Sequence, residues 1–92
     1  MNKPFNPAAL LSPDEIPAYL SDALDDDDPQ VFIAALGNVA RAQGISHIAE
    51  HTGLGRESLY KSLSGNSEPR WDTVIRVLRA MGLRLRPERG GG

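Results

Sequence analysis

The feature that most constrains this chain is the spacing of an alanine, a glycine and a leucine within residues 45–64. Ala49, Gly53 and Leu54 occur at the spacing expected where two short helices cross steeply around a tight turn. The crossing requires a small side chain, which Ala49 supplies, and the turn requires a left-handed backbone that glycine adopts at no steric cost. Leu54 fills the angle after the turn. These residues predict a helix-turn-helix over residues 45–64.

The two helices of this motif have recognisable ends and an inward face. Ser46 is expected to cap the first helix, and the second is expected to run for about nine residues and stop at Gly65. Apolar side chains that could hold both helices on a core are Ile45, Ile48, Leu59 and Leu63. A plain helical hairpin would need these apolar positions, but it would not need alanine, glycine and leucine at this spacing. We therefore favour a DNA-binding motif over a purely structural hairpin.

Three further helices are predicted from their capping and periodicity. An acidic helix and Asp run occupy residues 13–27, opened by Ser12 as cap and Glu15 in a capping box. A central core helix begins with Asp28 and Pro29 and ends at Gly44. A last helix carries an apolar stripe and ends at Gly82; its stripe is Val74, Ile75, Val77, Leu78 and Met81.

The expected fold is therefore all-α, a five-helix lambda-repressor-like helix-turn-helix domain over residues 13–86. Residues 1–12 and 87–92 lack a clear period and are expected to be a flexible N-terminal segment and a flexible tail. Leu83–Arg86 alternates apolar and basic residues and predicts a short C-terminal strand, which would be loose or would pair with a second copy. Trp71 is expected to anchor the last helix to the domain.

Charge is distributed unevenly along the sequence. Residues 1–40 contain seven acidic side chains and one basic one, Lys3, whereas residues 41–92 contain nine basic and five acidic side chains. Such polarity is compatible with a basic half that meets phosphate and an acidic half that meets a basic partner. Simple solvation of the surface is the alternative explanation.

Several classes of protein are excluded or disfavoured. The chain has no cysteine, which excludes disulfides and thiolate metal sites, and it has no apolar run of about 20 residues that could span a membrane. His47 and His51 are spaced i, i+4 around Glu50, but the HExxH order and a third ligand are absent. We therefore expect no catalytic residue, no metal and no cofactor, and a cytoplasmic protein that is not an enzyme.

The stretch from about Asp28 to Leu85 resembles the probable addiction module antidote protein family, HigA-like antitoxins with an Xre/Cro-type helix-turn-helix. The resemblance is carried by residues 34–37 (AALG), 53–63 (GLGRESLYKSL) and 74–83 (VIRVLRAMGL). It implies a compact helical domain, a small basic partner toxin of the RelE/HigB ribonuclease superfamily and repression of a shared operon. Gly55 stands where this family commonly has serine, so the cap of the second motif helix is expected to be weaker.

If the motif binds B-form DNA, the first residues of its second helix lie nearest the base edges. Arg56 is the candidate for a bidentate contact to guanine. The full set of expected DNA-binding residues is Ser46, His47, Gly55, Arg56, Glu57, Ser58, Tyr60 and Lys61. Tyr60 has an alternative place at the edge of the core. Candidate phosphate contacts, which could equally be solvated basic side chains, are Arg41, Arg70, Arg76 and Arg79.

The acidic N-terminal region is the expected toxin-binding surface, because its charge would complement a basic ribonuclease. The residues assigned to that contact are Tyr19, Leu20, Asp22, Leu24, Asp25 and Asp26. A homodimer on a palindromic operator is the physical expectation for a single short recognition helix. Two alternatives stay open: a solitary Xre-type repressor without a toxin, and a helical protein-interaction domain that does not bind DNA.

Overall fold

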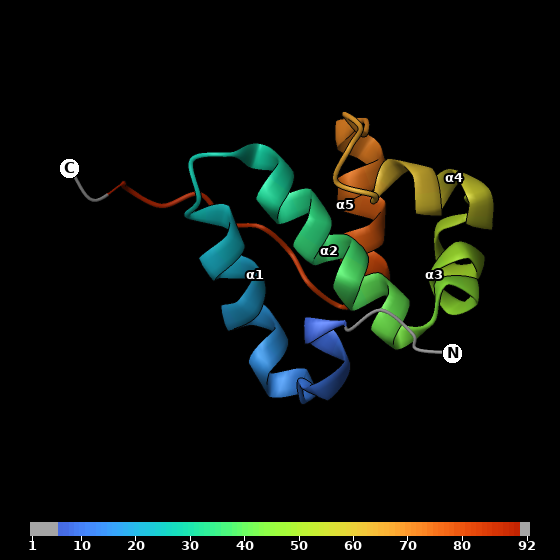
Figure 1. Cartoon of the computed structure of the whole chain (residues 1–92), viewed down its shortest axis with the longest axis horizontal. Coiled ribbons are helices and arrows are strands. Elements are labelled where there is room, and N and C mark those ends of the chain that lie inside the picture. Colours follow the sequence, from blue (N-terminus) through green and yellow to red (C-terminus); the bar gives the residue numbers. More distant parts are fainter. Residues whose placement is uncertain (1–5, 91–92) are drawn as a thin grey trace.

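The central helix of the fold is α2 (Pro29–Gln43), on which α1 (Ile16–Leu24) and α3 (Ile45–Thr52) pack (Figure 1). The computed structural model describes residues 6–90. The remaining helices are α4 (Arg56–Ser62), α5 (Trp71–Ala80) and two short 3-10 helices, η1 (Pro7–Leu10) and η2 (Pro13–Glu15). The prediction of five α-helices is confirmed for residues 6–90.

Local sequence signals explain both ends of α2. The side chain of Asp28 accepts a hydrogen bond from the main-chain N–H of Gln30 at 2.9 Å, and Pro29 occupies the first turn. The helix ends at Gly44, whose φ of 103° is a conformation that favours glycine. Between these ends, fully buried side chains make α2 the centre of the core; they include Leu36, Val39 and Ala40. The predicted start and end of the central helix are therefore confirmed.

The first described residues are more structured than their sequence suggested. Asn6 caps η1 by accepting from the N–H of Ala8 at 2.9 Å, and its amide donates to the carbonyl of Asn38 on α2 at 3.0 Å. Ala8 is buried against α2. Residues 7–10 thus form a 3-10 turn packed on α2 within the segment expected to be flexible, and the sequence did not indicate it because one such turn is too short to show a period. Residues 1–5 of the expected flexible segment lie outside the described residues.

The entry into α1 follows the predicted capping box but begins with a 3-10 turn. Ser12 and Glu15 form the box, with the Ser12 N–H donating to the Glu15 carboxylate at 2.9 Å. This hydrogen bond, with a second from the Ser12 hydroxyl, lowers the pKa of Glu15 from its ordinary value of 4.5. The α-helix then starts at Ile16, with Pro17 in its first turn, where a missing amide is tolerated.

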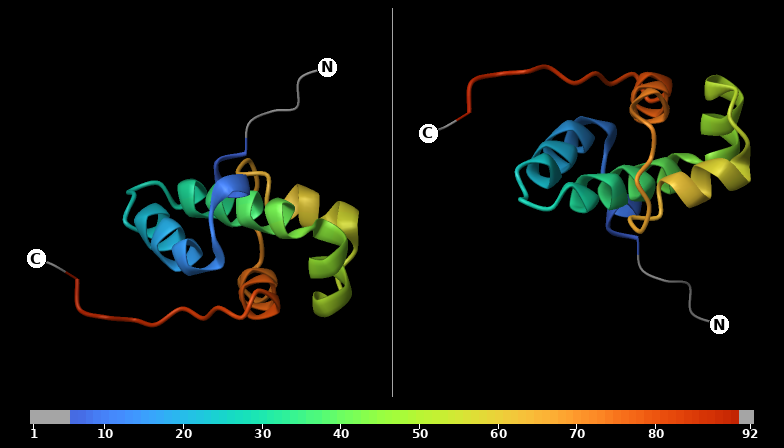
Figure 2. Two further views of the ribbon diagram at one scale, coloured as in Figure 1. Left: turned by 90° about the horizontal axis from the view of Figure 1, so that it is seen from below. Right: turned by 90° about the horizontal axis from the view of Figure 1, so that it is seen from above.

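The C-terminal segment is extended but is not a strand. Residues 83–90 have no regular secondary structure, and no strand occurs anywhere in the described chain. Leu83 and Leu85 are half-buried and pack against the core, while Arg84 and Arg86 are exposed. The strand predicted over Leu83–Arg86 is therefore wrong: the alternation reflects an extended chain lying on the domain, without a second strand to accept its main-chain hydrogen bonds. Figure 2 shows this segment running past α1.

Candidate functional site

The corner between α3 and α4 has the geometry that its glycine predicts. Gly53 adopts a left-handed conformation, with φ of 74° and ψ of 12°, and its N–H donates to the carbonyl of Ala49 at 2.9 Å. Ala49 and Leu54 are half-buried and pack against the core. The predicted roles of these three residues in the turn are consistent with this geometry. We call residues 45–63 the α3–α4 corner.

Thr52 holds this corner together, a role that the sequence interpretation missed. It is 9% exposed, its hydroxyl donates to the Ala49 carbonyl at 3.3 Å, and it accepts from the N–H of Leu54 at 3.2 Å. The hydroxyl thus bridges the end of α3 to the chain that follows the turn. A threonine immediately before a turn glycine is the signal that could have identified it, since such residues often bond to nearby main chain.

The helix α3 begins two residues earlier than a cap at Ser46 predicts. It starts at Ile45, and the carbonyl of Gly44 accepts from the N–H of Ile48 at 3.2 Å. The prediction that Ser46 caps this helix is wrong, because Gly44 both ends α2 and opens α3. Ser46 is instead an exposed residue within the first turn of α3.

The helix α4 is anchored from one side and exposed on the other. Leu59 and the adjoining Leu63 are 0% exposed. The residues that sequence reasoning assigned to DNA lie on the exposed side: Gly55, Arg56, Glu57, Ser58, Tyr60 and Lys61. All but Lys61 line a shallow hollow. Tyr60 is 46% exposed, which places it outside the core. The helix ends at Ser62, so it has seven residues, fewer than expected.

The two histidines of α3 lie against each other on the surface. The ring centroids of His47 and His51 are 4.2 Å apart, and His51 Nδ1 lies 3.0 Å from the carbonyl oxygen of His47. No group of three or more potential metal-ligating side chains occurs within residues 6–90. The exposed position of His47 beside the α3–α4 corner is compatible with a contact to a phosphate.

Two of the four basic side chains proposed for phosphate lie next to this corner. Arg76 and Arg79 of α5 line a shallow hollow together with His51 and Thr52. Arg70 pairs instead with Asp72 at 3.1 Å. Arg41, at the end of α2, donates to the side chain of Asn38 at 2.6 Å. The structure thus brings together Arg76 and Arg79 with the end of α3, and it gives Arg41 and Arg70 other partners.

The residues assigned to toxin binding divide into two groups. Tyr19 and Leu20 face inward: Leu20 is 5% exposed, and the Tyr19 hydroxyl accepts from the Asn38 amide at 3.2 Å. They form the stripe by which α1 packs on α2, so neither offers a free apolar surface. The others are exposed: Asp22, Leu24, Asp25 and Asp26. Leu24 is 47% exposed.

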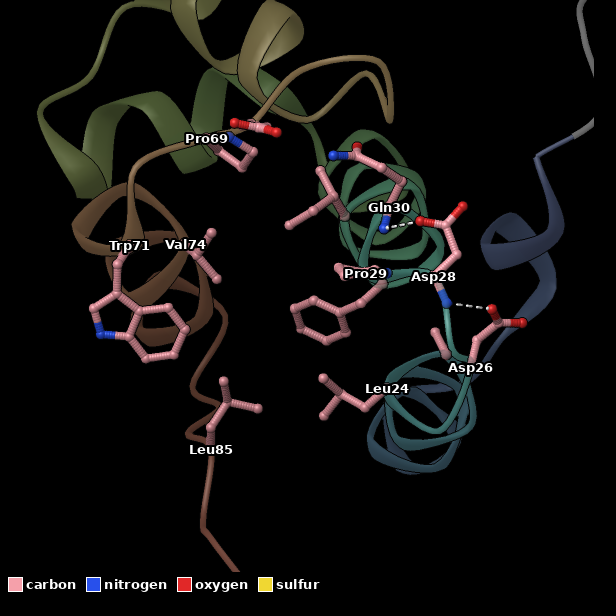
Figure 3. Close-up of a pocket in the computed structure, with 13 residues that line it drawn as sticks. Leu24, Asp26, Asp28, Pro29, Gln30, Pro69, Trp71, Val74 and Leu85 are labelled. Atoms are coloured by element: carbon pink, nitrogen blue, oxygen red, sulfur yellow. Dashed lines mark hydrogen bonds between the residues drawn. The ribbon is translucent and has the colours of Figure 1, made fainter.

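Beside Leu24 lies a groove that sequence reasoning did not identify (Figure 3). It has a volume of about 690 Å³ and separates the turn after α1 from the start of α5. Its principal apolar side chains are Leu24, Phe32, Trp71, Val74 and Leu85, and its acidic side chains are Asp26, Asp28 and Glu68. We call it the acidic groove. Trp71 is 66% exposed there, so its predicted role as an anchor of the domain is wrong.

The model of the family described as "Probable addiction module antidote protein" matches residues 2–89 of this chain. The chain belongs to this antidote family. It is also 42% identical over 76 residues to an uncharacterized protein of Haemophilus influenzae, an alignment that covers 83% of the chain and 78% of that relative. No solved structure matches it. Membership of the antidote family implies a partner toxin, and no helix among the described residues is long and apolar enough to cross a membrane.

Proposed function

We propose that this antidote neutralises a ribonuclease toxin of the RelE/HigB type and represses its own operon by binding operator DNA. The α3–α4 corner would then act as a lambda-repressor-like helix-turn-helix. The observation that carries the DNA-binding part is α4 itself: Leu59 fixes it to the core, while Arg56 and Lys61 point to solvent. A helix held in this way can enter a major groove without rearrangement of the domain.

In this proposal the exposed side of α4 reads base edges. Arg56 makes a bidentate contact to guanine, worth about 1–3 kcal/mol of discrimination against other bases. Glu57 accepts from cytosine, and Ser58 contacts either base edge. Tyr60 lies against a sugar or a thymine methyl group. Lys61 contributes a phosphate or base contact one turn further along the helix.

Flanking groups would position the helix on the duplex. Arg76 and Arg79, together with Ser46 and His47, are the candidates for contacts to the sugar-phosphate backbone. Such contacts set orientation and supply affinity that falls with salt, but they carry no sequence information directly. Because the helix is short, we propose a homodimer that reads two half-sites about 34–36 Å apart. Leu83–Arg86 and α5 are candidates for the dimer contact.

The toxin-binding part of the proposal rests on family membership and charge. The antidote family implies a toxin, and the acidic turn between α1 and α2 would attract a basic protein. A ribonuclease toxin and an operator are both cytoplasmic targets, so we propose that the protein acts in the cytoplasm.

The experiment that tests DNA binding measures affinity for the protein's own promoter at several salt concentrations. We expect the variant Arg56→Ala with Lys61→Ala to lose operator binding and to show a shallower salt dependence, since each lost phosphate contact lowers the slope by about 0.9. The matched control is Arg89→Glu, which lowers the net charge by the same two units at an exposed residue outside the α3–α4 corner. Operator affinity that is unchanged in the first variant would show that α4 is not the recognition helix.

A second experiment separates the antidote from a solitary repressor. The protein encoded by the adjacent open reading frame is expressed alone and together with this chain. We expect arrest of growth by the neighbour alone, recovery on co-expression, and co-purification of the two proteins. A harmless neighbour that does not co-purify would contradict the toxin assignment while leaving the operator experiment intact.

A further inference from the structure

We propose that the acidic groove is the docking site of the partner toxin, and that its occupant is an apolar side chain flanked by lysine or arginine. The inference rests on the proposed function, because it takes a toxin as the partner. It adds α5, through Trp71, to a surface that sequence reasoning confined to α1 and the acidic turn. The apolar lining and the surrounding charge each favour such an occupant.

The lining offers apolar area that the chain itself does not cover. Trp71 is 66% exposed and Leu24 is 47% exposed, and the buried residues Phe32 and Val74 also belong to the lining. Figure 3 shows Trp71, Val74 and Leu85 on one side of the groove and Leu24 on the other. Large exposed apolar side chains around a concavity mark binding surfaces, and tryptophan is enriched among residues that dominate binding energy.

The charge at the rim of the groove favours a cationic partner. Asp26, Asp28 and Glu68 belong to its lining, and Asp25 and Asp27 adjoin it. The carboxylates of Asp26 and Asp28 lie on the side of the turn away from Trp71 (Figure 3), so the negative charge surrounds the groove and does not fill it. Among residues 6–90 there is one ion pair, between Arg70 and Asp72, so these carboxylates have no cationic partner within the described chain. Their field repels phosphate and favours lysine or arginine, which argues for a basic protein and against nucleic acid at this surface.

The acidic groove is lined by the first residues of α2, up to Ile33, whereas α3 begins beyond the last residue of α2, Gln43. Figures 1 and 2 show α1 beside the N-terminal part of α2 and α3 at its C-terminal end. The groove shares no lining residue with the hollow along α4. A toxin seated in the groove would therefore leave α4 free, and the toxin-bound antidote would still bind its operator.

Trp71 is the only tryptophan of the chain, which provides a direct test. The protein is labelled with 5-fluorotryptophan, and its fluorine resonance is followed while the unlabelled product of the adjacent open reading frame is added. We expect the resonance to shift with the toxin and to stay in place when operator DNA is added. A toxin that binds without moving this resonance overturns the groove assignment.

Two substitutions test the energetics in the full chain. We expect Trp71→Ala to weaken toxin binding about 30-fold or more, the range of a central tryptophan, and Glu68→Lys to weaken it about tenfold through like-charge repulsion. The matched controls are Leu10→Ala, at a residue 83% exposed, and Asp14→Lys, at an exposed residue of η2. Thermal melting and operator binding verify that each variant folds.

The outcomes separate the inference from the proposed function. If the wild-type chain binds and neutralises the neighbour while both groove variants bind normally, the groove is not the site and the antidote function stands. If the neighbour does not bind the wild-type chain at all, both are overturned. If Trp71→Ala and Glu68→Lys abolish growth rescue but keep operator binding, the groove assignment is supported.

Discussion

The main-chain carbonyl oxygen of Leu63 lies against Gly37 of α2, in the space that a β-carbon at residue 37 would occupy. The same built β-carbon would lie 3.2 Å from Cβ of Leu63. This close approach is where the chain leaving α4 crosses the central helix. The position of the α3–α4 corner on the domain therefore depends on the absence of a side chain at Gly37.

We predict that Gly37→Ala lowers stability although alanine is the better helix former. The helix propensity gain is about 1 kcal/mol, whereas overpacking against main chain that cannot move freely costs typically about 1–3 kcal/mol. The expected net loss is about 1 kcal/mol, and at most about 2 kcal/mol on these figures; each kcal/mol lowers Tm by about 4–8 °C. Thermal unfolding followed by circular dichroism measures it.

The matched control is Gly90→Ala. A β-carbon at Gly90 would have no neighbouring atom within 4 Å, and the residue is exposed in the C-terminal segment. This substitution should leave Tm nearly unchanged. A Gly37→Ala protein as stable as Gly90→Ala would mean that the Leu63 segment can move away from α2 at little cost.

The two ends of α2 and the turn at Gly53 could be predicted from the sequence because local chemistry decides them. Asp28 with Pro29, and Gly44 with Gly53, act through hydrogen bonds and φ angles of their own neighbourhood. These signals need no knowledge of the rest of the chain. The same holds for the capping box of Ser12.

Other features depend on how distant segments meet, and the sequence could not supply them. The helical spacing of α1 puts Tyr19, Leu20 and Leu24 on one stripe. It does not show which of them α2 covers. Trp71 is exposed because the start of α5 stands away from Leu24 across the acidic groove. Residues 83–86 alternate apolar and basic side chains as a strand does. An extended segment packed on a core produces the same alternation.

A second prediction concerns the cap of α2. Asp28→Ala should lower stability by about 1 kcal/mol, within a usual range of about 0.5–2 kcal/mol, because the N–H of Gln30 loses its acceptor. The control is Asp27→Ala, since Asp27 accepts no hydrogen bond within the described chain. Urea unfolding of both variants measures the difference. Equal midpoints would show that the carboxylate of Asp28 does not stabilise the helix.

A third prediction concerns acid unfolding. The pKa of Glu15 is lowered by its hydrogen bonds to Ser12, so the stabilisation from Glu15 is fully present above the unfolded-state value of 4.5. It is lost as the pH falls through the lower folded-state pKa. We expect Glu15→Gln to reduce the dependence of Tm on pH below about 4.5. Above that pH the Tm profile of the variant should run parallel to that of the wild type. Asp14→Asn is the control, and identical profiles for wild type and Glu15→Gln would contradict the role of the box.

The last prediction links the α3–α4 corner to operator binding through Thr52. Leu54 is half-buried, and its N–H donates to the Thr52 hydroxyl at 3.2 Å. In Thr52→Val this N–H loses its acceptor, which costs about 1–3 kcal/mol of stability. The angle between α3 and α4 then becomes less constrained, so operator affinity should fall more than the loss of folded protein explains.

Thr73→Val on α5 is the control, because Thr73 is also half-buried and its hydroxyl has no hydrogen-bond partner within residues 6–90. Affinity measured at a temperature where both variants are fully folded separates the two effects. If Thr52→Val binds the operator as well as Thr73→Val does, the bridge made by Thr52 contributes to folding alone.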